Sequence, residues 1–265
     1  MSSASETIAR AAGTPSGPAT PAASATPPAS ATPSASATSP ASATQSRFVA
    51  LWQNPVGKKA VMAVTGLVLF GFTLVHMTGN LQAFGGSAKL DHYAELLRIS
   101  MPFLWFTRIV LGVSVLLHVV AGLQLWLSKR AARTVDYQDY RPQTSSVASR
   151  TMLVSGLVLL GFVAGHLMDL TLGTPGLAPA GFEHGRVYAN LVASLSRGAA
   201  GTIYVVAVVG LGFHLWHGLW SVTQSLGFAH RGVSAVIQKT AIFFAVLLTC
   251  GFAAVPIAVL LGLVR

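Results

Sequence analysis

The apolar positions of the chain gather into five long runs separated by polar or glycine-rich stretches. The runs cover residues 60–81, 102–127, 151–172, 199–226 and 240–264. Each is at least about 20 residues long, which is what an α-helix needs to cross the hydrocarbon core of a bilayer. The runs are continuous, whereas the strands of a membrane barrel alternate apolar and polar residues. The pattern therefore predicts an all-α fold, a polytopic membrane bundle of five transmembrane helices.

Two segments between the runs show a different periodicity. In residues 87–101 the apolar Leu90, Ala94, Leu97 and Met101 recur at helical spacing, with charged residues between them. Residues 182–195 show a weaker version of the same pattern. An amphipathic helix of this kind lies in the membrane interface with its apolar face inward, so we expect two surface helices.

The first 46 residues form a separate region. Ala, Ser, Thr and Pro make up 39 of the 46, and Glu6 and Arg10 are the only charged residues among them. A segment without apolar periodicity has nothing to bury and stays disordered. We therefore expect a disordered tail over residues 1–46 and a membrane domain over residues 47–265.

Composition narrows the chemistry. Only 9% of the 265 residues are charged and 52% are hydrophobic, whereas soluble domains carry about 25% charged residues. Cys250 is the only cysteine, which excludes disulfides within the chain and sites built on cysteine clusters. No dinucleotide-binding G-x-G-x-x-G fingerprint occurs. Without a C-x-x-C-H motif, any haem is held non-covalently.

The distribution of cations gives an orientation. Lys and Arg number 17, against seven Asp and Glu, for a net charge of +10. Apart from Arg10, ten cations flank the runs on the side of the N-terminus and six on the opposite side. Because cytoplasmic loops carry the excess of Lys and Arg, we expect a cytoplasmic N-terminus and an external C-terminus.

Five of the eight histidines fall inside the apolar runs. These are His76, His118, His166, His214 and His217, whereas His92, His184 and His230 fall in loops. An ionisable side chain within the bilayer is costly to bury and indicates function.

Depth sorts these histidines into two layers. His76 lies 17 residues after Lys59, and His166 lies 16 residues after Arg150. At 1.5 Å per residue, both are about 25 Å from the cytoplasmic boundary.

The other two runs place histidines nearer the cytoplasm. His118 precedes Lys129 by 11 residues, and His214 precedes Gly227 by 13 residues, or about 17 and 20 Å. Two layers of paired imidazoles on four helices suit two haems, each held by two axial histidines. His214 and His217 share a helix face, so only one of them fits this scheme.

Several motifs carry a resemblance to a known family. They are His76-Met-Thr-Gly-Asn-Leu-Gln-Ala-Phe-Gly, Ser149-Arg-Thr-Met, His166, Phe213-His-Leu-Trp-His-Gly-Leu-Trp-Ser and Gln224-Ser-Leu-Gly. The chain resembles, over residues 54–265, the five-helix di-haem cytochrome b membrane-anchor subunit of succinate:quinone oxidoreductases (succinate dehydrogenase/fumarate reductase).

The resemblance implies a set of ligands and partners. His76 and His166 would bind the iron of an outer haem b, and His118 and His214 that of an inner haem b, while His217 falls on a non-ligand position. The chain would be non-catalytic alone toward succinate. It would anchor a flavoprotein subunit and an iron–sulfur subunit in the inner (cytoplasmic) membrane. Electrons would pass between the iron–sulfur subunit and a quinone, menaquinone or ubiquinone. Lipid is the remaining partner, and no nucleic acid is expected.

Further polar residues are candidates for binding quinone and haem propionates. Quinone reduction consumes two protons, so polar groups on the outer side are candidates for that site: Asp169, His92, Tyr93, Glu95 and Arg98. Asp169 is the only carboxylate within an apolar run, either a proton-handling group or a solvated residue near a helix end. Haem propionates are the predicted partners of Arg108, Arg150 and Lys129, cations that otherwise snorkel to the interface. His217 would bond a haem propionate, a carbonyl or a quinone.

Two alternatives stay open. The chain is either this anchor or a cytochrome b anchor of another membrane dehydrogenase, of the hydrogenase or formate dehydrogenase type. A proton-coupled transporter with a histidine relay is a third possibility, although no inverted repeat supports it. A haem spectrum separates the first two from the third.

Overall fold

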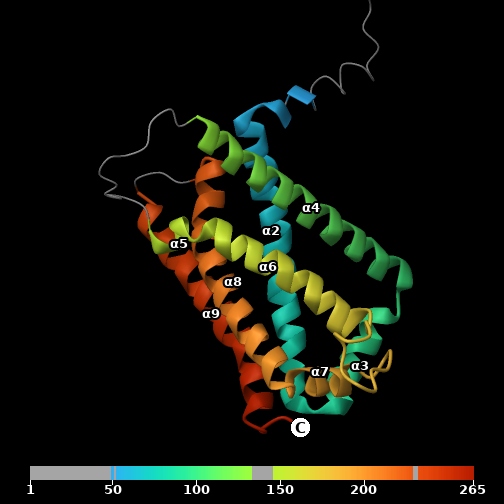
Figure 1. Cartoon of the computed structure of the whole chain (residues 1–265). Helices are drawn as coiled ribbons and strands as arrows, with labels where there is room; N and C mark the ends of the chain where they lie inside the picture. The colour runs from blue at the N-terminus through green and yellow to red at the C-terminus, as the bar shows by residue number, and fades with distance from the viewer. Residues whose placement is uncertain (1–48, 51, 133–145, 229–231) are drawn as a thin grey trace, which may run out of the picture. The chain divides into compact units, whose positions relative to one another are not determined.

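The computed structural model describes residues 49–50, 52–132, 146–228 and 232–265. These residues form helices and connecting turns without any β-strand (Figure 1), which confirms the all-α prediction. The expected tail over residues 1–46 lies outside the described residues. The elements are α2 (Pro55–Asn80), η1 (Leu81–Gly85), α3 (Ser87–Arg98), α4 (Met101–Ala131), α5 (Val147–Arg150), α6 (Met152–His166), η2 (Leu167–Thr171), α7 (Val187–Leu195), α8 (Gly198–Ser225) and α9 (Ser234–Leu260).

Five of these helical stretches are long and apolar enough to cross a membrane. They are Pro55–Gly85, Met101–Ala131, Met152–Thr171, Gly198–Ser225 and Ser234–Leu260, one for each apolar run, and they support an integral membrane protein. The fifth helix differs in its bounds from the predicted residues 240–264. Helix α9 starts six residues earlier, and the apolar pattern missed this start because the first turns carry polar side chains. It ends four residues earlier, where Gly262 turns the chain with a φ of 70°.

Local sequence explains where two of the long helices begin. The Asn54 side chain accepts a hydrogen bond from the Val56 amide at 2.9 Å, and Pro55 follows directly. Ser100 does the same for the Phe103 amide at 3.4 Å, with Pro102 in the first turn. Side-chain acceptors satisfy the free amides of a first turn, and proline fits there because it has no amide proton to lose.

The long helices pack in a defined order. Helix α2 lies against α4, α8 and α9, and α8 lies against α9 and α6. Met77, Leu215 and Leu248 form a buried cluster where α2, α8 and α9 meet. Most large apolar side chains elsewhere on the long helices are exposed, as expected for surfaces that face lipid.

The two expected surface helices close one end of the bundle. Helix α3 matches most of its predicted segment, whereas α7 begins only at Val187, after turns over residues 182–186. Leu90 of α3, Leu195 of α7 and Val259 of α9 lie in one buried cluster. Figure 1 shows both short helices at the end of the bundle where the chain terminates.

Candidate functional site

The structure brings four of the intramembrane histidines together in two pairs. The ring centroids of His76 on α2 and His166 on α6 are 5.9 Å apart, with the ring planes inclined by 76°. The centroids of His118 on α4 and His214 on α8 are 6.2 Å apart, at 59°. These are the pairs expected from depth along the helices.

The spacing within each pair fits one metal ion between two imidazoles. With metal–nitrogen bonds of about 2.0 Å and nitrogens roughly 1.1 Å from the ring centre, two opposed imidazoles have centroids roughly 6 Å apart. Among the residues that the structure describes, no group of three or more His, Cys, Asp or Glu forms a metal site. Two ligands alone suit a metal that brings its other ligands, as haem iron does.

Each pair joins two helices that are not close packing neighbours. The close contacts are those of α2 with α4 and α8, and of α6 with α8. The His76–His166 pair instead spans from α2 to α6, and the His118–His214 pair from α4 to α8. The imidazoles therefore meet across the bundle, in the position where bundle proteins hold cofactors.

The inner pair is held by hydroxyl and glycine residues of the neighbouring helix. His118 Nδ1 lies 3.1 Å from the Met62 carbonyl oxygen and 3.4 Å from Thr65 Oγ1. A Cβ atom built on Gly66 would approach His118 Cε1 to 3.2 Å, so any larger residue there would press on this ring and force it to shift by a few tenths of an ångström.

His214 is held in the same manner by α6. Its Nδ1 lies 3.4 Å from Ser155 Oγ, and a Cβ on Gly156 would lie 3.5 Å from its Cε1. When Nδ1 is engaged in this way, Nε2 stays available as a metal ligand.

The outer pair is packed by aromatic rings. Phe72 stacks on His76 with centroids 5.2 Å apart, and Phe162 stacks on His166 at 5.7 Å. Phe252 of α9 also faces His76 at 5.8 Å. His166 differs in having a polar partner, because its Nδ1 lies 3.2 Å from the Tyr204 hydroxyl.

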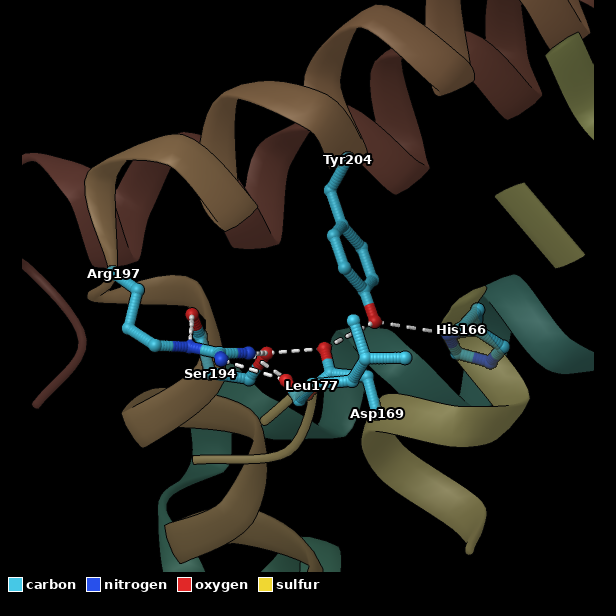
Figure 2. Close-up of polar contacts among 6 residues, drawn as sticks. All are labelled: His166, Asp169, Leu177, Ser194, Arg197 and Tyr204. Atoms are coloured by element: carbon cyan, nitrogen blue, oxygen red, sulfur yellow. Dashed lines mark hydrogen bonds and ion pairs between the residues drawn. The ribbon is translucent and has the colours of Figure 1, made fainter. Parts of the chain in front are cut away.

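Asp169 is the centre of a buried polar network next to this pair (Figure 2). It lies in the π-helical turn η2, with 6% of its surface exposed. Arg197 Nη2 donates to its Oδ1 at 2.8 Å and the Tyr204 hydroxyl to its Oδ2 at 3.0 Å, and Ser194 Oγ also donates to Oδ2. Asp169 is therefore not a solvated residue at a helix end.

The other quinone candidates share α3, and no hydrogen bond joins their side chains to this network in the described part of the chain. The side chains of His92 and Glu95 are 68% and 73% exposed and lie 3.8 Å from each other. The Tyr93 ring packs against Gly79 of α2, and Arg98 is exposed in the last turn of α3. The polar partners of Asp169 are Ser194, Arg197 and Tyr204, and a common quinone site for the five candidates stays a prediction.

The propionate candidates are spread over both ends of the helices. Lys129, in the last turn of α4, is close enough to His217 for its charge to act on that ring. Arg108 lies over the Trp105 ring at 5.1 Å, and Arg150 is an exposed residue that ends α5. Their contacts with a cofactor stay predictions.

Gln124 of α4, six residues after His118, is a buried polar group that does not stand out in the sequence. Its Oε1 is buried without a hydrogen-bond partner in the described part of the chain. Buried acceptors are almost always satisfied, so this atom is free to accept a hydrogen bond from a bound group.

An internal repeat in the sequence indicates several of the residues that contact the paired histidines. Residues 62–76 and 152–166 align without gaps and share nine of fifteen residues: MAVTGLVLFGFTLVH and MLVSGLVLLGFVAGH. A hydroxyl residue followed by glycine, named here the hydroxyl–glycine step, occurs in both copies as Thr65-Gly66 and Ser155-Gly156. The stacking phenylalanine and the histidine also recur at the same positions. This repeat identifies Thr65, Gly66, Ser155 and Gly156. Tyr204 and Arg197 lie outside it and become visible only in the fold.

Comparison with known proteins gives one result. A family model described as "Succinate dehydrogenase/Fumarate reductase transmembrane subunit" matches residues 128–254. This is just under half of the chain, and it includes His166, His214 and the Asp169 network. The match supports the family resemblance found in the motifs. No curated protein and no solved structure matches the chain.

Proposed function

We propose that the chain is the membrane-anchor cytochrome b subunit of a succinate dehydrogenase/fumarate reductase complex. The observation that carries the proposal is the pairing of four histidines from four spanning helices at centroid separations of 5.9 and 6.2 Å. The family match over residues 128–254 supports the same conclusion for the C-terminal half.

In this proposal the chain holds two b-type haems at different depths. Haem b, when bound, supplies one-electron transfer. His76 and His166 would hold the outer haem, and His118 and His214 the inner one. The hydroxyl–glycine steps of α2 and α6 orient the inner pair, and the stacked phenylalanines fix the outer pair. Rigidly held ligands keep the geometry of an electron carrier constant between its two oxidation states.

The chemistry on succinate belongs to other subunits. Cys250 is the only cysteine of the chain, and an iron–sulfur cluster needs several. We propose that a flavoprotein and an iron–sulfur subunit dock on the end of the bundle where α2 and α9 begin and α4 ends. That end carries Lys58, Lys59, Lys129, Arg130 and Lys239 and would face the cytoplasm. Quinone would be bound near the opposite end.

A redox spectrum of the purified complex tests the proposal. We expect about two haems per chain and the reduced-minus-oxidised spectrum of low-spin haem with two histidine ligands. The same preparation should contain a flavoprotein and an iron–sulfur protein. A preparation of the folded protein without haem would refute the proposal, and co-purification with hydrogenase or formate dehydrogenase subunits would reassign the partner.

A further inference from the structure

The four paired histidines differ in what holds their second ring nitrogen. Nδ1 of His118 faces a backbone carbonyl and a threonine hydroxyl, and Nδ1 of His214 faces a serine hydroxyl. The ring of His76 is packed between Phe72 and Phe252. Only Nδ1 of His166, among these four, reaches a buried carboxylate, through the hydroxyl of Tyr204 (Figure 2).

The hydrogen bonds that link His166, Tyr204 and Asp169 allow one assignment of donors and acceptors. The carboxylate of Asp169 accepts hydrogen bonds from Arg197, Ser194 and Tyr204. A phenol has a single hydroxyl proton, and Tyr204 uses it to donate its hydrogen bond to Asp169. The phenol oxygen can therefore only accept from His166, which places the imidazole proton on Nδ1 and leaves Nε2 with its lone pair.

The carboxylate is itself fixed from two sides. Arg197 Nη2 also contacts Ser194 Oγ at 3.0 Å, and its Nη1 donates to the Leu177 carbonyl oxygen at 2.6 Å. These bonds tie the beginning of α8 to the end of α7 and to the loop after η2. The Asp169 carboxylate is thus held in position before any ligand binds to His166.

We propose that Tyr204 and Asp169 are positioning residues for His166, and that they lower the reduction potential of the outer haem relative to the inner one. A histidine that donates its second N–H toward a carboxylate is a more basic ligand, and a more basic ligand stabilises the oxidised metal. This inference rests on the proposed function, because it requires a haem bound to His166. It assigns to Asp169 a role in tuning the ligand instead of one in binding quinone.

A potentiometric titration of the haems in the purified complex tests this. The variants are Tyr204→Phe, which removes the linking hydroxyl, and Asp169→Asn, which removes the charge behind it. Tyr188→Phe is the matched control, because its hydroxyl donates to the Arg265 carbonyl oxygen and no hydrogen bond or ring contact joins it to a histidine of the described residues.

The expected result is a selective change at one haem. Tyr204→Phe should keep both haems and shift the one-electron equilibrium of the outer haem toward the reduced form by about tenfold, which corresponds to about 59 mV. Asp169→Asn should shift it in the same direction. The inner haem and both haems of Tyr188→Phe should be unchanged. Selective loss of the outer haem in Tyr204→Phe would also support a positioning role.

Two results would overturn the inference. If Tyr204→Phe retains two haems with unchanged potentials, the hydroxyl does not act on His166, while the proposed function stands. If it loses both haems equally, the hydroxyl serves the fold in general. Failure of the proposed function is distinguishable from both, because the unmodified complex would then lack haem.

Discussion

Residues 62–76 of α2 and 152–166 of α6 are two copies of one helical pattern in different surroundings. Each copy uses its hydroxyl–glycine step to receive a histidine from another helix, His118 or His214. Each also ends in a histidine of its own, eleven residues after the hydroxyl. One helix thus serves both layers, because eleven residues are close to three full turns and bring both positions to the same face.

The copies carry chemically different residues at the position three residues after the histidine. In α2 this position is Gly79, against which the Tyr93 ring of α3 packs. In α6 it is Asp169, which receives Arg197, Ser194 and Tyr204. The comparison teaches that the repeated part provides ligands and space, whereas the residues that follow give each histidine its own electrostatic environment.

The largest expected effect is the loss of one haem. His76→Ala and His166→Ala lie in different copies, yet both should lose the same outer haem, leaving about one haem per chain. His118→Ala and His214→Ala should both lose the inner one. The measurement is the haem content together with the potential of the remaining haem.

His92→Ala is the control for these variants, because this side chain is 68% exposed. It should keep both haems. If His76→Ala and His166→Ala lost different haems, the pairing across the bundle would be wrong.

The second effect concerns the glycines of the two hydroxyl–glycine steps. Gly66→Val and Gly156→Val place a branched side chain against His118 and His214, where a Cβ alone would lie 3.2 and 3.5 Å from the ring. We expect an affinity for the inner haem roughly 10- to 100-fold lower, as for other residues that support a metal ligand, with the larger loss at Gly66. Titration of the haem-depleted protein with haem measures it.

The matched control for the glycine variants is Gly112→Val on α4. A Cβ there would meet no other atom within 4 Å, so inner-haem affinity should stay within about twofold of the unmodified protein. Equal losses for Gly66→Val and Gly112→Val would show that valine disturbs the helices generally.

The smallest effect tests the position at which the copies diverge. Gly79→Ala brings a methyl group within 2.7 Å of Tyr93 Cε1 and overpacks the contact between α2 and α3. Asp169→Asn keeps the volume but weakens the bond to the partly exposed Arg197. Each should lower the free energy of unfolding by about 1 kcal/mol, measured by thermal unfolding in detergent.

Asp91→Asn provides a reference for these two variants. Its side-chain oxygen accepts a hydrogen bond from the Tyr188 amide at 2.9 Å, which an amide oxygen can replace, so the free energy of unfolding should change by less than about 0.5 kcal/mol. If the free energy of unfolding is unchanged in both Gly79→Ala and Asp169→Asn, the contacts at this position do not stabilise either copy.

The helices and the two histidine pairs could be predicted from the sequence because both follow from local properties. Length and apolarity define a spanning helix, and the fixed rise per residue converts the spacing from Lys59 to His76 into a depth. The boundaries of α9 were less accurate, since an apolar run ends where hydropathy changes, whereas a helix ends where the backbone turns at Gly262. The repeat was also present in the sequence, and comparing the two runs directly would have found it.

The Asp169 network could not be predicted in this way. Asp169 stands out in the sequence as the only carboxylate in an apolar run. Its partners do not, because Ser194, Arg197 and Tyr204 follow it at separations of 25 to 35 residues. Their meeting depends on the π-helical turn of η2, on the loop that leads to α7, and on how α8 packs against α6. A local sequence pattern does not encode how these three segments are arranged in space.

The sequence by itself therefore determined an all-α protein with five spanning helices and two layers of paired histidines. The tertiary structure decided which groups surround each histidine: glycine and hydroxyl groups for His118 and His214, aromatic rings for His76, and a phenol backed by a carboxylate for His166. The physical reason is that span and depth follow from the geometry of a single helix. A hydrogen-bonded environment requires several helices to reach one point at once.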